Sequence, residues 1–527
     1  MSTDHSLKPS KFAAILRAQY TTASFPQRPE HPRAEQKKIV SEMNHERTWQ
    51  GLASIVLAFS VCILGLAVPD NASARQQQPT ATGKSKGRTV SREDVASLLR
   101  EAALLLQSGK LDEAEPLVRR AVAAAPSNAD AHNLLGTILD QRGQTQAAER
   151  EYLAALRFNP RSISARANLG VLLARMGRAD AAVAAFEAVL RQVPDHPQAT
   201  INLALLYGAR GDYNRAVPLF ERVRRQQPDN LSVLSQLGFA LYQLKRFDEA
   251  AAVLASAASL APTDPDVLYL SGLVATLRGD SEAAVNFWQR ALAQRADFAA
   301  ANFMIGEELR KQRRYEGAVE SYQRALDQDA AQLVYYVRLG GTYMLLVHYD
   351  RALEVFQRAA QRFPASAEAQ YFVGIAARGY GNFDTAEAAL RKSLALKESN
   401  VDALTQLGFV IGESGRNAEA ERLLRRALAI DPRHFYANYD LGRLLVRAKR
   451  YDEAIGVLAG AAQIRARDPG VHYQLFLTYT RLKRKDDADR ELAIFKQYDA
   501  ESKARRRQGD EQIEDTLPRS ASDGKPD

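Results

Sequence analysis

Histidines and paired carboxylates are the residues of this sequence that could carry catalysis or bind a metal. The chain has eight histidines, no two of which stand at a metal-ligand spacing, and it contains no H-E-x-x-H motif. The histidines are His5, His31, His45, His132, His196, His348, His434 and His472. The acidic pairs Asp112-Glu113 and Asp452-Glu453 recur at one place in a repeated phrase, which favours helix capping over general acid–base catalysis. We therefore expect no catalytic residue, no cofactor and no metal site, and we predict that the protein is not an enzyme.

The repeated phrase has a fixed period of 34 residues. It reads GDYNRA at 211–216, KRFDEA at 245–250, VHYDRA at 347–352 and KRYDEA at 449–454. Alanine closes the phrase at twelve positions, without any insertion: Ala114, Ala148, Ala182, Ala216, Ala250, Ala284, Ala318, Ala352, Ala386, Ala420, Ala454 and Ala488. Twelve residues upstream of each alanine stands Gly or Ala, except at Phe476. A constant period of this length is the sequence signature of a stacked repeat array.

Each unit of the array is expected to form two helices. Leu237, Leu241 and Leu244 recur at helical spacing, which predicts an amphipathic first helix. A short break follows, often with glycine, and then an acidic residue stands where it can cap the second helix and suit its dipole. Small residues at fixed places in both helices predict a close crossing, with an aromatic residue of the second helix beside it.

This pattern resembles the tetratricopeptide repeat. The unit QATINLALLYGARGDYNRAVPLFERVRRQQPDNL has the residues of that family in place or nearly so: Leu203, Ala204, Tyr207, Tyr213, Ala216, Phe220 and Pro228. The resemblance covers residues 95–502. It implies an all-α, right-handed α-solenoid (superhelix) of about twelve 34-residue helix-turn-helix repeats that binds protein partners.

In the family that the pattern resembles, the first helix of each repeat lines a concave groove. Reading the groove positions from this sequence gives asparagines in the early repeats and aromatic and arginine residues later. The predicted partner-binding residues are Phe239, Tyr242, Tyr269, Phe303, Arg338, Tyr371, Phe372, Arg378, Phe409, Tyr439, Arg443 and Tyr473. Helical spacing alone leaves open whether each ring faces the groove or packs against the next repeat. A groove lined by these aromatic and arginine residues would suit an extended peptide with apolar and acidic side chains.

Charge and cysteine content narrow the class of partner. The formal net charge is +9, but both signs are interspersed through the repeats, which is typical of a solvated surface rather than a phosphate track. We therefore expect no nucleic-acid partner. The single cysteine, Cys62, cannot form a disulfide within the chain, so cysteine content does not identify the compartment.

The N-terminal part contains an apolar segment. Gly51 to Val68 is a run of eighteen residues without a charge, and Ala72-Ser73-Ala74 after it fits a signal-peptidase site. The run is also long enough to span a membrane, so a cleaved signal and a retained anchor through 51–68 both remain open. Residues 1–50 would then be a basic disordered extension, with a possible true start at Met43. We assign 51–74 to the signal or anchor, 75–94 to a flexible linker and 503–527 to a disordered charged tail.

These observations predict a non-catalytic protein–protein interaction scaffold of the cell envelope. The chain would be periplasmic or secreted after cleavage near Ala74, or alternatively anchored in the membrane. Two other functions remain possible on the sequence. One is a membrane-anchored assembly factor that docks other subunits. The other is a carbohydrate-binding or glycosyltransferase-associated repeat module, because aromatic grooves also stack sugars.

Overall fold

The structure is a computed structural model that describes residues 92–514, with side chains described from 94 to 504. The predicted extension, the signal or anchor and the charged tail beyond Glu514 lie outside these residues, as does nearly all of the predicted linker. Within the described part of the chain, no helix is both long and apolar enough to cross a membrane.

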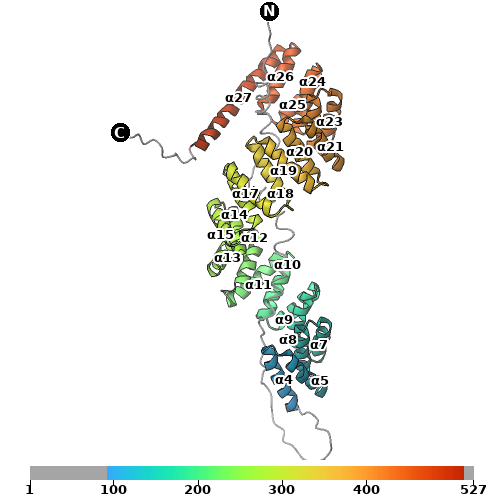
Figure 1. Cartoon of the computed structure of the whole chain (residues 1–527), viewed down its shortest axis with the longest axis vertical. Helices are drawn as coiled ribbons and strands as arrows, with labels where there is room; N and C mark the ends of the chain where they lie inside the picture. The colour runs from blue at the N-terminus through green and yellow to red at the C-terminus, as the bar shows by residue number, and fades with distance from the viewer. Residues whose placement is uncertain (1–91, 515–527) are drawn as a thin grey trace, which may run out of the picture. The chain divides into compact units, whose positions relative to one another are not determined.

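Between residues 92 and 514 the chain forms 24 helices and no strand (Figure 1). They form two units that meet after Ala296, and each unit contains six helix pairs. The first unit contains α4 (Arg92–Gln107), α5 (Leu111–Ala124), α6 (Ala129–Gln141), α7 (Thr145–Phe158), α8 (Ile163–Arg175), α9 (Ala179–Gln192), α10 (Pro197–Ala209), α11 (Tyr213–Gln226), α12 (Leu231–Gln243), α13 (Phe247–Leu260), α14 (Pro265–Arg278) and α15 (Ser281–Gln294).

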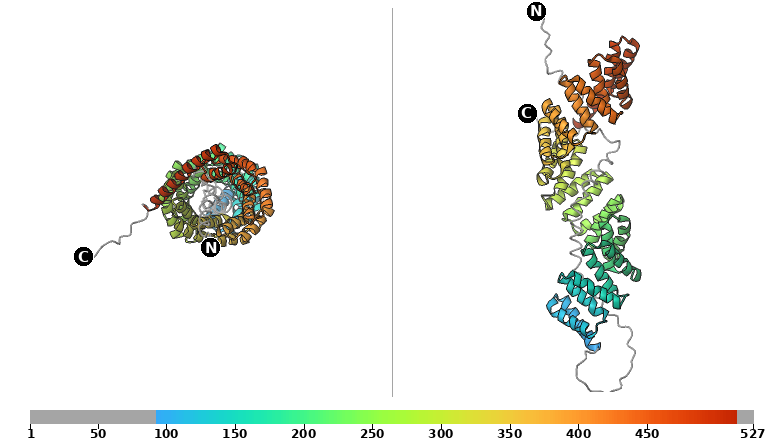
Figure 2. Two further views of the ribbon diagram at one scale, coloured as in Figure 1. Left: turned by 90° about the horizontal axis from the view of Figure 1, so that it is seen from above. Right: turned by 90° about the vertical axis from the view of Figure 1, so that its right-hand side faces the viewer.

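The second unit contains α16 (Ala299–Lys311), α17 (Tyr315–Gln328), α18 (Leu333–Leu345), α19 (Tyr349–Arg362), α20 (Ala367–Tyr380), α21 (Phe383–Leu396), α22 (Val401–Glu413), α23 (Asn417–Ile430), α24 (Phe435–Arg447), α25 (Tyr451–Ile464), α26 (Pro469–Arg481) and α27 (Lys485–Glu514). Two further views show the same succession of antiparallel pairs within each unit (Figure 2). The predicted fold class, an all-α solenoid of twelve helix-turn-helix repeats, is confirmed.

The two helices of a repeat begin in different ways. First helices are often capped by a side chain: Asn128, Ser366 and Asn400 each accept a hydrogen bond from the backbone N–H three residues on. The second helix α13 instead follows Arg246, which makes no side-chain cap bond, and Asp248 and Glu249 lie in its first turn. The predicted capping role of such acidic pairs is therefore wrong for α13. It is also wrong for the pairs Asp112-Glu113 of α5 and Asp452-Glu453 of α25, whose helices follow Lys110 and Arg450 without a side-chain cap bond. Glu249 accepts a hydrogen bond from Arg246 at 2.7 Å, and both carboxylates suit the positive end of the helix dipole.

The turn between the two helices needs one residue in the left-handed region. Glycine occupies this place in seven of the described repeats, as at Gly279 and Gly381, where it avoids steric strain. Lys245, Arg313, Val347, Lys449 and Lys483 occupy it in the other five. Val347 is the least suited of these residues because its side chain branches at Cβ. Packing of the flanking helices thus outweighs a local cost of roughly 1–3 kcal/mol.

Within a repeat, the two helices cross where the first has a glycine and the second a large side chain. A Cβ atom added at Gly340 would lie 2.5 Å from Cζ of Phe356, and one added at Gly442 would lie 2.5 Å from Cδ2 of Leu458. At Gly272 the obstacle is Trp288, whose Nε1 donates to the carbonyl of Tyr269 at 3.1 Å. The predicted close crossing is confirmed. It is the contact that makes a pair of helices into one repeat.

Ion pairs also connect successive repeats along the outer edge of the second unit. Arg416, three residues past the end of α22, donates to Glu387 on α21 of the preceding repeat at 3.0 Å. Arg450 stands at the same place one repeat later and contacts Glu421 at 2.8 Å. Hydrogen bonding from Arg416 lowers the pKa of Glu387 below its ordinary value. Both arginines are well exposed to solvent, so the contribution of each pair to stability is small.

The glycine crossing yields a stability prediction with a matched control. We expect Gly340→Ala to destabilise the second unit by about 1–3 kcal/mol, because the new methyl group would overlap the Phe356 ring. Gly456→Ala, inside α25 with open space around the new methyl group, should instead stabilise by about 0.5–1 kcal/mol through helix propensity. Denaturant unfolding monitored by circular dichroism would measure both. Equal effects of the two substitutions would contradict the proposed role of the crossing.

Candidate functional site

The predicted partner-binding residues fall into four registers, each defined by positions that differ by multiples of 34. The first contains Tyr269, Phe303, Tyr371, Tyr439 and Tyr473. The second contains Arg338 and Phe372, the third Phe239, Phe409 and Arg443, and the fourth Tyr242 and Arg378. Residues of one register occupy the same place in their repeats, so their surroundings can be compared directly.

The first register packs mainly between repeats. Phe303 is 0% exposed, and its ring centroid lies 4.8 Å from that of Tyr335 on the first helix of the next repeat. Tyr439 is 8% exposed and lies against Gly470 at the start of α26. Burial raises the pKa of Tyr439 to about 12. Tyr473, in the last repeat, is 38% exposed.

The prediction that Phe303 contacts a partner in the groove is therefore corrected. Its ring is fully enclosed by the helices of its own repeat and of the next one, and it serves the core. Tyr269 is also buried, at 8% exposure. Helical spacing placed both rings on the first helix but could not tell which part of that helix the next repeat covers.

Phe239 and Tyr242 form a separate aromatic cluster in the first unit. Their ring centroids are 6.3 Å apart and stacked, and Tyr213 meets Phe239 edge-on at 5.9 Å. Tyr242 is buried, whereas Phe239 is partly exposed. These residues belong to α11 and α12 and give the first unit its own small aromatic face.

Arg338 stabilises a buried carboxylate. Its Nε lies 3.2 Å from Oε1 of Glu307, which is almost fully buried and also accepts a hydrogen bond from the hydroxyl of Tyr322. Arg310 completes the arrangement with an ion pair of 3.4 Å to Glu307. Burial raises the pKa of Tyr322, and the neighbouring carboxylate raises it further. Because a charge buried without a partner would be costly, we assign Arg338 to the structure of the repeat rather than to binding.

Tyr371 and Phe372 lie on α20 at the edge of the core. The Phe372 ring stacks on that of Phe356 with centroids 5.1 Å apart, and Tyr371 meets Phe372 at 5.6 Å. Both residues are partly exposed. Burial raises the pKa of Tyr371, and the carboxylate of Asp402 adds to the effect.

Four predicted residues come together on α20, α22 and α24. Two guanidinium groups lie near the Phe409 ring on α22, with Cζ of Arg378 5.2 Å and Cζ of Arg443 5.9 Å from its centroid. Arg443 is also 5.9 Å from the ring centroid of Tyr439. Phe409, Arg378 and Arg443 are all partly exposed. We call Arg378, Phe409, Glu413, Asp440, Arg443 and Arg447 the arginine–aromatic face.

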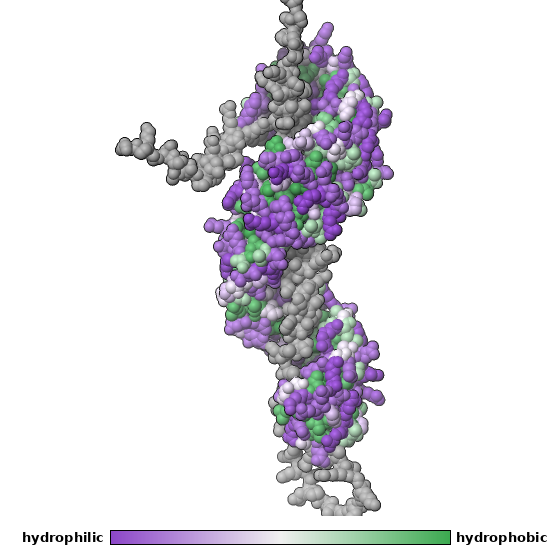
Figure 3. Space-filling view, in the orientation of Figure 1, coloured by the Kyte–Doolittle hydropathy of each residue, from purple (hydrophilic) through white to green (hydrophobic). Residues whose placement is uncertain are grey.

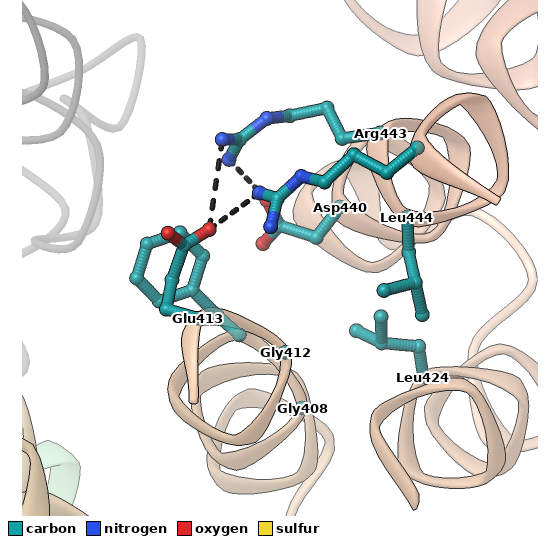
Figure 4. A pocket seen from close by; sticks show the side chains of 9 residues that line it. Gly408, Gly412, Glu413, Leu424, Asp440, Arg443 and Leu444 are labelled. Carbon is teal, nitrogen blue, oxygen red and sulfur yellow. Dashed lines mark hydrogen bonds and ion pairs between the residues drawn. The ribbon is translucent and has the colours of Figure 1, made fainter. Parts of the chain in front are cut away.

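Two acidic residues of this face were missed by the sequence analysis. Glu413 lies 3.8 Å from Arg443 and 2.5 Å from Arg447, and Asp440 lies 3.5 Å from Arg443 (Figure 4). The sequence does carry a signal for one of these pairs, because Glu413 and Arg447 stand one period apart on successive first helices. The carboxylates hold the arginine side chains over the hollow between α22 and α24.

The hollow itself is too small for a metabolite. Gly408, Gly412, Leu424 and Leu444 form its floor, and its volume is about 10 Å³, which is about the space of one water molecule. Small-molecule sites usually enclose roughly 300–1,000 Å³. The arginine–aromatic face is thus suited to contact with an extended partner surface. Among the described residues no group of three or more metal-ligating side chains is clustered.

The rest of the visible surface is mainly polar. Hydrophilic residues cover most of the face shown in Figure 3, and hydrophobic residues form small separate patches on it. On this polar surface, the aromatic rings beside arginine are the side chains best suited to bind a protein. Tyrosine, tryptophan and arginine often contribute most of the binding free energy at a protein–protein interface.

Stacked pairs of antiparallel helices at a fixed period define an α-solenoid repeat protein. Family models named tetratricopeptide repeat match residues 99–163, 161–229 and 209–274. A model described as the Cilia and flagella-associated protein 70 C-terminal domain matches residues 273–511. The chain belongs to the tetratricopeptide repeat family, whose members bind protein partners.

Solved structures similar to this chain include yeast Tom70, at 14% identity over 78% of this chain and 96% of that one, with a TM-score of 0.32. The Cut9–Hcn1 hetero-tetramer of APC/C matches at 15% identity over 78% of this chain and 94% of that one, with a TM-score of 0.37. MamA matches at 24% identity over 33% of this chain and 94% of that one, with a TM-score of 0.29. No match was found among curated proteins.

The first register predicts different effects of removing two of its rings. Phe303→Ala should destabilise the second unit by about 3–5 kcal/mol, because it leaves a cavity between repeats. Tyr473→Ala should cost less than about 1 kcal/mol, because this ring is partly solvated and no later repeat packs on it within the described residues. Thermal melting of the two variants beside the parent protein would measure the difference. A melting temperature lowered as much by Tyr473→Ala as by Phe303→Ala would contradict the assignment.

Proposed function

We propose that this protein is a non-catalytic interaction scaffold of the cell envelope that binds a segment of a partner protein on the arginine–aromatic face. The observation that carries the proposal is Phe409, a partly exposed ring on α22 with the guanidinium groups of Arg378 and Arg443 within 6 Å of its centroid. Three successive first helices contribute to the face, so a segment lying across α20, α22 and α24 would contact all of it.

The chemistry of the face favours a partner with apolar and acidic side chains. An apolar group would pack on the Phe409 ring, and a carboxylate would approach the guanidinium groups beside it. Glu413 and Asp440 already contact Arg443, so a bound carboxylate would exchange with carboxylates of the protein itself. This competition limits the affinity that a partner carboxylate gains from the face.

The binding prediction uses three variants and an array of peptides. An array of acidic and apolar peptides, each printed beside its amide counterpart, would be probed with the full chain. We expect Phe409→Ala and Arg443→Ala each to weaken binding to the selected acidic peptides by about 1–2 kcal/mol. Arg422→Ala, an exposed arginine on α23, is the matched control and should have no effect. Circular dichroism would confirm that all three variants are folded.

Two outcomes of the same array would refute this proposal. Equal binding of acidic peptides and their amide counterparts would remove the role of the arginines. Retention of binding by folded Phe409→Ala and Arg443→Ala would place the contact elsewhere on the protein. A glycan array probed in parallel tests the carbohydrate-binding alternative directly.

The envelope location is supported by the sequence of residues 51–74. An apolar run followed by Ala72-Ser73-Ala74 fits export with cleavage after Ala74. We expect N-terminal sequencing of the mature protein to begin at Arg75, with the protein in the periplasmic or secreted fraction. A mature chain that retains Gly51 to Val68 in the membrane fraction would favour the anchored assembly factor, and a full-length chain in the cytosol would contradict both.

A further inference from the structure

The C-terminal end of the array carries an aromatic surface that differs from the rest of the repeats. Tyr473 on α26 is 38% exposed, although three residues of its register, Tyr269, Phe303 and Tyr439, are at most 8% exposed. The Tyr473 ring centroid lies 5.2 Å from that of Phe495 and 6.2 Å from that of Phe476. We call these three rings the terminal aromatic surface.

Two of the three rings replace small residues. Phe476 stands where every other repeat has Gly or Ala, and Phe495 stands in the register of Ala427 and Ala461, which are fully buried. Terminal repeats are normally atypical because a polar outer face protects the end of the core from water. In this last repeat the small residues are replaced by large apolar rings, Phe476 and Phe495. Solubility alone would favour polar residues at these positions.

The earlier repeats indicate what covers this register. Gly470 at the start of α26 lies against Tyr439, and Tyr335 of α18 stacks on Phe303. In each case the covering element is the first helix of the following repeat. Beyond the first fourteen residues of α27 the chain does not turn back to form such a helix, because α27 continues to Glu514, for 30 residues (Figure 1). The second helices of the preceding repeats have 14.

An acidic residue on α27, Asp489, also corresponds to a residue that joins earlier repeats. Glu387 and Glu421 on second helices accept an arginine that follows the first helix of the next repeat, Arg416 and Arg450 respectively. The same register in the last repeat holds Asp489, which is exposed. The end of the array therefore presents an aromatic and an acidic position like those of Tyr371 and Glu387 at the junction with α22. At the junction with α26 the acidic position holds Ile455 instead.

We propose that the terminal aromatic surface and Asp489 bind an amphipathic helix of a partner protein, which packs as the first helix of a further repeat would. The repeat interface specifies the chemistry of that helix. It has about thirteen residues, with an apolar face that includes small residues and a basic residue about three positions past its end. This surface lies at the end of the array and is independent of the arginine–aromatic face.

The chain itself supplies a probe of this chemistry. Residues 400–416, NVDALTQLGFVIGESGR, form α22 and end in Arg416, and α22 contacts α20 and α21. In the preceding repeat, on which α22 packs, Tyr371 and Glu387 occupy the positions that Tyr473 and Asp489 occupy three repeats later. A fluorescein-labelled peptide of this sequence should bind the full chain, which fluorescence anisotropy would measure.

Protein and peptide variants identify the contact. We expect Tyr473→Ala to weaken peptide binding by about tenfold, whereas Tyr380→Ala, which removes a ring that is 58% exposed at the end of α20, should change nothing. Asp489→Lys should weaken binding by about threefold, and a peptide with Arg416→Glu should restore the affinity of that variant. Asp489 is at the surface, so this second arm does not depend on the packing of Tyr473.

Four results would overturn the proposal. The first is the absence of saturable binding of the peptide. The second is binding that neither Tyr473→Ala nor Asp489→Lys alters, which would mean that the peptide sits elsewhere. The third is concentration-dependent self-association of the full chain in sedimentation velocity that Tyr473→Ala abolishes, which would make a second copy the occupant. Loss of peptide binding in Arg443→Ala but not in Tyr473→Ala would assign the peptide to the arginine–aromatic face instead.

Discussion

The close crossing of two helices inside each repeat is the constraint on which the rest of the structure depends. Gly340 under Phe356 and Gly442 under Leu458 show its two forms, an aromatic and an aliphatic side chain filling the space that a missing Cβ leaves. A residue larger than glycine at these positions would separate the helices and shift the surface that they present to the next repeat. Because every repeat stacks on its neighbour, the geometry of one crossing sets the positions of first helices on either side.

This dependence explains why binding chemistry can gather on the array without a dedicated loop or domain. Arg378, Phe409 and Arg443 come from three successive first helices, and the interval between them in the sequence is close to one period. Each crossing holds its helix in place, so side chains about 34 residues apart become neighbours on one face. The acidic residues Glu413 and Asp440 then orient the arginines at a modest electrostatic cost.

Charge plays two different roles in the second unit. At Glu307 it is buried, and Arg310, Arg338 and Tyr322 must all remain in place because the carboxylate has little access to water. Along the outer edge, pairs such as Arg450 with Glu421 are partly exposed and contribute register rather than much stability. The ion pairs of the arginine–aromatic face lie between these limits: the side chain of Arg443 is 15% exposed and that of Glu413 is 24% exposed.

The sequence by itself determined the number of repeats, the two helices in each and the close contact between them, because a period of 34 and small residues in phase are local features that any reader of the chain can count. It also placed Arg378, Phe409 and Arg443 on first helices. It could not decide that Phe303 is core, that Arg338 neutralises Glu307 or that the acidic pair of α13 leaves its N-terminus uncapped. Those outcomes depend on how much of each first helix the next repeat covers and on which side chains of neighbouring repeats meet. That coverage is set by the angle between successive repeats, which is a property of the packed structure and is not encoded in helical spacing.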